Sequence, residues 1–396
     1  MREKYIFRVL IFLYTVLLFC LTLFSYSQID LNLTLSSNAS YQSLQNQLIY
    51  LGYYNRPLST LIYGVLIFLF FILYFLILRL VRQKKFSLSH VNYFLVLSLG
   101  ILFFSYPAFS HDLFNYMFDA RIVTKYHANP YLYKALDFPS DLWIRFMHWV
   151  HRTYPYGPVW LMITLPFSYL GFERFVPTLF AFKLMFTLFH VGNSILIYRI
   201  LKEKSPKDAA VGLTFYALNP LILIESLVSP HNEVVMLFFL LLALYLLFLK
   251  RKIGLGWINL LFSIGVKFMT IILVPVFLFA GFLGKKKEPK IKWYLIVFLI
   301  AIALIGEMIY REPYPWYFIM LIGVVSLLPE NKDIQVITIG VSLGALLRYA
   351  PYLFVGSYPF RVISWQAWVF VVPIVFSVTF VLLGHIQGGL GVGGKK

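Results

Sequence analysis

A group of acidic and aromatic side chains follows a long apolar segment that ends near residue 108. Asp112 stands beside His111, and Tyr116 and Asp119 follow four and seven positions after Asp112. On a helix these spacings place the last three side chains on one face. A carboxylate at a lipid–water boundary among aromatic rings is partly desolvated, which suits it to take a proton from a hydroxyl group. A helix cap or a solvated loop acid is the alternative interpretation.

A second polar group separates two apolar segments. The residues Ser229, Pro230, His231, Asn232 and Glu233 follow one another directly. Three polar side chains at a tight turn between helices could bind a sugar or a phosphate. The alternative is that Asn232 only caps the helix that follows.

Cations inside or beside apolar segments form a third group. Lys267 interrupts an apolar stretch, and ionisable residues within membrane segments are costly and usually functional or paired. It is therefore a candidate to bind an anionic group such as a lipid phosphate. Lys183 is a weaker candidate that could snorkel to the interface. Arg311 could meet a phosphate, whereas an interfacial aromatic belt accounts for Trp316 and Tyr317 without any function.

The elements that position these residues are predicted to be transmembrane helices. The chain of 396 residues is 60% hydrophobic and 13% charged, with a mean hydropathy of +0.80. A soluble domain is about half apolar and about a quarter charged. Apolar segments near the ~20-residue length of a bilayer span recur along the chain. We expect an all-α polytopic membrane protein of about 10–12 transmembrane helices, forming one integral membrane domain over residues 1–396.

The distribution of positive charge along this chain, whose net charge is +18, predicts the orientation of these helices. The positive charges lie in short clusters between apolar segments, as the positive-inside rule predicts for cytoplasmic loops, and they do not indicate a nucleic-acid partner. The outer loops are then 25–58 and 109–156. The short segment 157–170 becomes a juxtamembrane helix, and 253–283 becomes a helical hairpin that bends near Gly265–Lys267. The basic clusters are Arg79/Arg82/Lys84/Lys85, Arg199/Lys202/Lys204/Lys207, Lys250/Arg251/Lys252, Lys285/Lys286/Lys287/Lys290/Lys292 and Lys395/Lys396.

Metal-binding patterns are not evident in the sequence. His111 and His231 are too few and too isolated, and neither C-x-x-C nor H-E-x-x-H occurs. We therefore expect no metal site and name no cofactor, although a single divalent cation held by carboxylates remains an open alternative.

Several short motifs, taken together, resemble one family. They are 110–116 (SHDLFNY), 128–131 (ANPY), 156–161 (YGPVWL), 219–225 (NPLILIE) and 231–236 (HNEVVM). Their order and spacing resemble the polyprenol-phosphomannose-dependent branch of the GT-C membrane glycosyltransferases and related membrane hexosyltransferases. Lys267 and the P-W-Y sequence at 315–317 lie where such proteins carry a lysine and the same tripeptide. The similarity covers about residues 90–320, although the family more often has Asp at the position of Glu233.

The resemblance implies a GT-C-like bundle with an extracytoplasmic catalytic loop. It makes Asp112 the general base, places His231 and Asn232 in the site, and brings Lys267 to the donor phosphate. The implied reaction is inverting transfer of a hexose, with mannose as the first expectation, from a polyprenyl-phosphate donor to an extracytoplasmic glycan or lipid acceptor. The protein would lie in a bacterial plasma membrane. The other residues expected to bind substrate are His111, Tyr116, Asp119, Arg121, Tyr156, Glu233 and Arg311.

A transporter or flippase without chemistry is the rival class. Many transporters show internal repeats and broken helices at matching positions of two halves, with polar residues near the midplane. No repeat is evident in this sequence, and its polar residues gather on one predicted face. The enzyme interpretation is therefore preferred.

Overall fold

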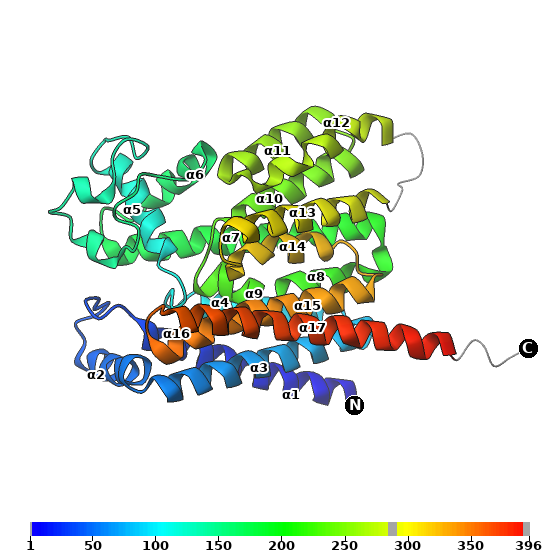
Figure 1. Ribbon diagram of the computed structural model, residues 1–396, viewed down its shortest axis with the longest axis horizontal. Helices are drawn as coiled ribbons and strands as arrows, with labels where there is room; N and C mark the ends of the chain where they lie inside the picture. The colour runs from blue at the N-terminus through cyan, green and yellow to red at the C-terminus, as the bar shows by residue number, and fades with distance from the viewer. Residues whose placement is uncertain (1, 284–290, 391–396) are drawn as a thin grey trace, which may run out of the picture.

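Helices make up all the regular structure of the residues that the computed structural model describes, which are 2–283 and 291–390. Most of them run along the long axis of the molecule (Figure 1). Within the described residues six helices are long and apolar enough to cross a membrane, and the number rises to seven if a pair bent by 53° forms one span. This confirms the all-α membrane fold.

The helices account for the apolar segments expected from the sequence. Five shorter apolar helices add to the long ones and to the bent pair, which is Pro206–Ala217 with Pro220–Val228. The helix bounds are α1 (Arg2–Ser25), α2 (Ala39–Ile49), α3 (Arg56–Arg82), α4 (Leu88–Leu102), α5 (Asp112–Thr124), α6 (Pro158–Tyr169), α7 (Phe175–Lys204), α8 (Ala209–Ala217), α9 (Pro220–Leu223), α10 (Glu233–Leu244), α11 (Ile253–Val266), α12 (Val274–Leu283), α13 (Ile291–Tyr310), α14 (Phe318–Val325), α15 (Lys332–Leu347), α16 (Tyr349–Val355) and α17 (Phe360–Leu390).

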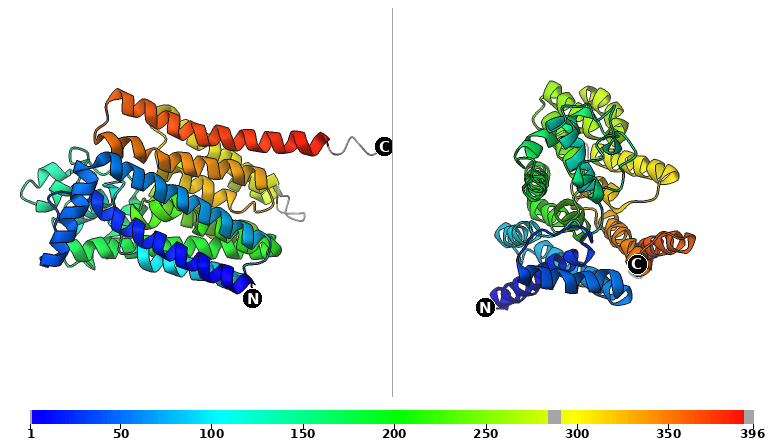
Figure 2. Two further views of the ribbon diagram at one scale, coloured as in Figure 1. Left: turned by 90° about the horizontal axis from the view of Figure 1, so that it is seen from below. Right: turned by 90° about the vertical axis from the view of Figure 1, so that its left-hand side faces the viewer.

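The bundle is organised around α10. This helix is apolar on every side and most of its residues are buried, as expected of a helix surrounded by others. By contrast, α17 lies at the edge beside α15 (Figure 2). Gly340 and Gly344 make that pairing close, because a Cβ atom there would stand 2.3 Å from Ser377 Oγ and from the Phe370 carbonyl oxygen respectively. Small residues four apart allow membrane helices to approach in this way.

The two ends of the bundle differ in character. The helices α2, α5 and α6 lie at one end, and the chain termini lie toward the other (Figure 1). At the terminal end, Lys204 pairs with Glu330 over 3.7 Å and Lys250 pairs with Glu203 over 2.7 Å. The side chain of Arg82 donates there to Gln335. The expected basic residues Lys285, Lys286, Lys287, Lys290, Lys395 and Lys396 lie outside the described residues.

The outer loop contacts the break between two helices at Lys267 through Gly157 and Gly265. The backbone N–H of Gly157, which precedes α6, donates to the Val266 carbonyl over 3.3 Å. A Cβ atom at Gly157 would stand 2.1 Å from the Gly265 carbonyl oxygen, so no larger residue fits without movement. The backbone is extended at Lys267, where α11 ends and a 3-10 helix, η8 (Phe268–Leu273), leads to α12. The Y-G-P sequence at 156–158 thus packs the outer loop against the point where α11 ends.

The orientation can be tested with single cysteines. In a Cys20→Ser background, Ser37→Cys and Ser140→Cys should react with an impermeant maleimide in intact cells, because both positions are exposed at the α2 and α5 end. Lys207→Cys, at the basic end, should react only after permeabilisation. Labelling at 207 but not at 140 in intact cells would reverse the topology. Ser229 is unsuitable as a probe, because its side chain is buried.

Candidate active site

Asp112 is a partly accessible carboxylate at the start of α5. Its backbone N–H donates to Ser110 Oγ over 3.2 Å, and an acid in the first helical turn is favoured by the helix dipole. The side chain is 15% exposed, whereas most neighbouring polar side chains described below are buried completely. A substrate hydroxyl could therefore reach this carboxylate.

His231 lies directly behind Asp112. Its Nε2 atom is 3.9 Å from Asp112 Oδ2, and its Nδ1 atom is 3.0 Å from Glu225 Oε2. The imidazole stacks on Trp316 with centroids 4.1 Å apart and planes within 12°, and Trp316 in turn stacks on Tyr314. Burial alone would lower the pKa of His231, but the hydrogen bond and charge of Glu225 outweigh it and raise the pKa. The imidazole thus lies between two carboxylates that favour its protonated form.

A π-helical turn, η6 (Ile224–Val228), shapes this region. It extends α9, and the backbone N–H of Ser229 closes it by donating to the Ile224 carbonyl over 2.8 Å. The next bond runs from the His231 N–H to the Glu225 carbonyl over 3.0 Å. Ser229 Oγ accepts from the Phe109 N–H over 2.9 Å, which ties the turn to the loop before Asp112. Single π turns inside helices are frequent at functional sites.

Glu225 and Trp316 are site residues for which the sequence predicted no role. Glu225 is fully buried and accepts a hydrogen bond from the Tyr349 hydroxyl over 2.9 Å, besides contacting His231. The sequence could have indicated a role for Glu225, because an acid within a membrane segment is costly and usually functional or paired. The sequence explained Trp316 by an interfacial aromatic belt, and the structure adds that its ring stacks on the imidazole of His231.

Lys267 forms an ion pair with Glu233 at the first turn of α10. Its Nζ donates to Glu233 Oε1, and the ammonium stands 4.8 Å from the centroid of the Tyr317 ring. Glu233 is fully buried, and the Lys267 side chain is 18% exposed. Lys267 is therefore not an uncompensated cation, although part of it remains accessible.

Arg311 interacts with the same tyrosine. A hydrogen bond to the Tyr317 side chain raises the pKa of Arg311. Arg311 is 61% exposed and lies 3.8 Å from the Glu307 carboxylate. Two cations thus converge on Tyr317, which suits the place to an anionic group.

Tyr116 and Tyr156 form an aromatic wall beside Asp112. Their ring centroids are 5.4 Å apart, and Tyr116 meets Trp160 edge-on at 5.0 Å. His111 stacks on His148 at 4.0 Å on the outer side, and its Nδ1 contacts the Phe146 carbonyl. These contacts hold the first turn of α5 between α6 and the loop that follows α5.

Asn232 does not cap α10 with its side chain. It occupies the N-cap position without making the capping hydrogen bond. Both polar atoms of its side chain are buried, and neither has a hydrogen-bond partner within the described protein. Buried amides are rarely left unsatisfied. The capping alternative therefore fails, and Asn232 is available to a ligand group.

Two other cations have structural partners. Arg121 points into the outer loop, where its Nε is 2.7 Å from Asp141 Oδ2 and its guanidinium lies 4.0 Å from the centroid of the Trp143 ring. The structure does not bring Arg121 to the cluster around Asp112. Lys183 does not snorkel, because it is buried and donates to the Leu102 carbonyl at the end of α4.

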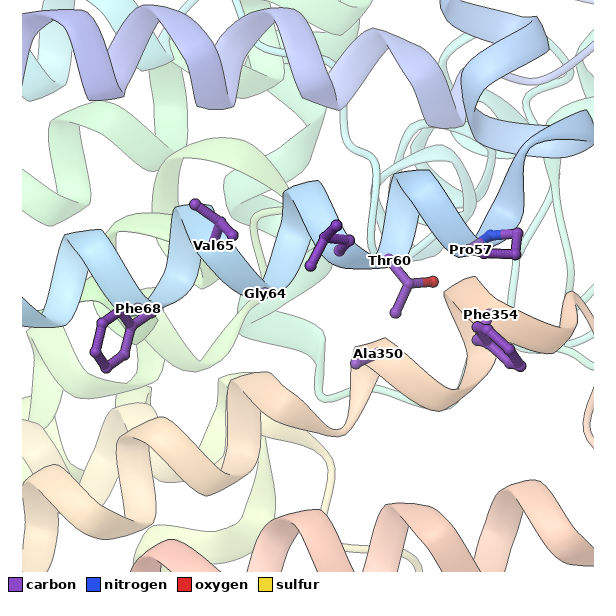
Figure 3. A pocket seen from close by; sticks show the side chains of 8 residues that line it. Pro57, Thr60, Gly64, Val65, Phe68, Ala350 and Phe354 are labelled. Carbon is purple, nitrogen blue, oxygen red and sulfur yellow. The ribbon is translucent and has the colours of Figure 1, made fainter.

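An apolar groove lies between α3 and α16 (Figure 3). Its volume is about 510 Å³, and it contains none of the residues of the cluster. Tyr63 and Tyr349 come from the same two helices but do not line it. The lining residues are Pro57, Thr60, Leu61, Gly64, Val65, Phe68, Ala350 and Phe354. Among the described residues, no group of three or more His, Cys, Asp or Glu side chains could hold a metal ion.

The fold and the cluster define an integral membrane protein with a carboxylate–imidazole site at one end of a helical bundle. A family model described as alpha-(1->6)-mannopyranosyltransferase, N-terminal domain, matches residues 32–282, and the chain belongs to this family. The chain is 25% identical over 193 residues to alpha-(1->6)-mannopyranosyltransferase A of Corynebacterium glutamicum. That match covers 47% of this chain and 39% of the relative, so the chain spans about two fifths of the length of the relative. No solved structure matches.

Asp119 provides a pH-dependent test of the site. Burial raises its pKa from 3.8 to about 7, against the opposing charge of Arg152. An unfolded chain loses this proton at lower pH than the folded protein does. The stability of the wild type should therefore fall as pH rises from about 4 to 7 and level off above 7. In detergent, Asp119→Asn should gain in unfolding temperature relative to the wild type between pH 5 and pH 8. A difference independent of pH would contradict the burial of this carboxyl.

Proposed function

We propose that this protein is an inverting mannosyltransferase that uses a polyprenyl-phosphate donor and an extracytoplasmic glycan or lipid acceptor. The observation that carries the proposal is the accessible Asp112 carboxylate beside the buried His231, in a chain of a mannosyltransferase family. The family description supports mannose as the sugar. The basic clusters at the opposite end of the bundle support an extracytoplasmic site within a single integral membrane domain.

Asp112 acts as the general base in the proposed reaction. It takes the proton of the acceptor hydroxyl as the new bond between that oxygen and the anomeric carbon forms. The bond from the anomeric carbon to the phosphate oxygen breaks on the opposite face, and polyprenyl phosphate leaves with the bonding electrons. Displacement from behind inverts the anomeric centre, so a β-linked donor gives an α-linked product.

Lys267 and Arg311 bind the donor phosphate in this mechanism. Both contact Tyr317, one over its ring and the other through its hydroxyl. His111, Tyr116, Tyr156 and Asn232 are proposed to contact the sugars, since aromatic faces and amide groups suit sugar rings and hydroxyls. Nucleotide sugars do not occur outside the cytoplasm, and the described residues hold no soluble nucleotide-binding domain. A lipid-linked donor follows from these two points.

The first test is Asp112→Asn. Removing a general base typically costs ~10²–10⁴-fold in rate, so turnover with synthetic polyprenyl phosphomannose should fall by about that factor. Donor binding should survive, because the amide keeps the shape and polarity of the carboxyl group. Formation of mannosylated acceptor and release of polyprenyl phosphate by the purified protein are the measurements.

Asp119→Asn is the matched control for that test. It lies on the same face of α5 but about two turns further along, so a smaller effect on turnover is expected. Full loss of turnover in Asp119→Asn with normal turnover in Asp112→Asn would move the base to Asp119. A wild-type protein that consumes no donor would favour a transporter or flippase instead.

The second test concerns Lys267. Lys267→Met alone would leave the Glu233 carboxylate buried and unpaired, which typically costs about 3–5 kcal/mol. The informative variant is therefore Lys267→Met with Glu233→Gln, which removes both charges. A charged hydrogen bond contributes about 1.5–3 kcal/mol, so donor affinity should fall by about 10- to 150-fold. Fluorescent donor binding in detergent measures the change.

Glu233→Gln alone is the control for the ion pair. It keeps the Lys267 cation and removes a negative charge, so donor affinity should stay equal or rise. Wild-type affinity in the double variant would show that Lys267 serves only as the partner of Glu233.

A further inference from the structure

Glu225 is a buried acid that no substrate could reach without passing His231 or the surrounding helices. Its side chain is fully buried, and Oε2 lies 3.0 Å from His231 Nδ1. The Tyr349 hydroxyl donates to Oε1 over 2.9 Å. A row of close contacts therefore runs from the Tyr349 hydroxyl through the Glu225 carboxylate to His231, and the imidazole Nε2 faces Asp112 at 3.9 Å.

The local backbone is built to present Glu225 to His231. The π-helical turn η6 includes Glu225, and the backbone N–H of His231 returns to the Glu225 carbonyl. The same two residues are therefore joined twice, once through the backbone and once through the side chains. Trp316 covers one face of the imidazole with planes within 12°, which leaves the ring little freedom to rotate.

We propose that Glu225 is a positioning residue that acts through His231 to orient Asp112. The inference rests on the proposed function for its kinetic consequence, but the state of the imidazole can be measured without any reaction. The Glu225 carboxylate lies 3.0 Å from Nδ1 of the imidazole, and the Asp112 carboxylate lies 3.9 Å from Nε2. The ring is therefore held between the two carboxylates, with Glu225 behind it and Asp112 in front of it.

The charges around this row favour the cationic imidazole. Asp112, Glu225 and Glu233 all act to raise the pKa of His231, whereas its burial lowers it. Glu233 is itself paired with Lys267, so its influence is partly compensated. Glu225 lies 3.0 Å from the ring and is the carboxylate with the largest effect on the pKa of His231. The charged or titratable groups coupled to Asp112 in turn are Tyr116, Asp119, His148, Tyr156, His231, Lys267 and Tyr314.

The kinetic test is a double-mutant cycle with Glu225→Gln and His231→Gln. Glutamine keeps a hydrogen-bonding group near Nδ1 but removes the negative charge. Glu225→Gln should lower kcat by about 10- to 100-fold, with a much smaller change in donor KM. In the His231→Gln background, Glu225→Gln should have little further effect.

Conservative and remote variants separate positioning from folding. Glu225→Asp retains the charge and should keep the imidazole of His231 protonated at pH 7 even if turnover falls. Glu203→Gln, at the opposite end of the bundle, should change neither turnover nor the state of the imidazole. Additive losses in the cycle would overturn the proposal.

An activity-independent measurement completes the test. In protein labelled with 15N-histidine, the His231 signal is assigned by its loss in His231→Gln. The wild-type imidazole should remain doubly protonated at pH 7, and it should become neutral at that pH in Glu225→Gln. A doubly protonated imidazole in Glu225→Gln would reject the role of Glu225, whatever reaction the protein catalyses. Failure of mannosyl transfer with the expected imidazole behaviour would reject the proposed function alone.

Discussion

The burial of ionised groups inside an apolar bundle is the constraint on which this structure depends. Glu225 and Glu233 are fully buried, and each is matched by a cation, His231 and Lys267 respectively. Removing charges from water is expensive, and only close pairing with further hydrogen bonds offsets the cost. The Tyr349 hydroxyl supplies one such bond to Glu225. The two pairs therefore require several helices to stay in register.

The helices break where these pairs form. The π turn η6 ends at Val228, the chain turns at His231, and α11 ends before the extended backbone of Lys267. Irregular backbone within a membrane bundle is tolerated only where protein or an aqueous cavity satisfies it. In this protein the breaks lie toward one end of the bundle and meet the outer loop through Ser229 and Gly157. The charged pairs thus lie where the helices break.

Two residues that lie beyond the region matched by the family model complete the cluster. The matched region, 32–282, contains Asp112, Glu225, His231, Glu233 and Lys267. Trp316, which covers His231, and Tyr349, which binds Glu225, both follow that region. The later helices therefore form a wall of the site, although the acids and bases come from the earlier part of the chain. A fragment ending near residue 282 would leave His231 and Glu225 without these two contacts.

The sequence by itself determined the all-helical membrane fold, because long apolar segments can satisfy their backbone only as helices. It also predicted roles for Asp112, His231, Asn232, Glu233 and Lys267, because polar side chains between apolar segments are uncommon and costly. Tertiary structure alone decided how these residues pair. It joined Lys267 to Glu233, gave Glu225 and Trp316 their places against His231, and directed Arg121 to Asp141 instead. Such pairings join residues tens to hundreds of positions apart, and hydropathy and spacing along one segment carry no information about which distant helix supplies the partner.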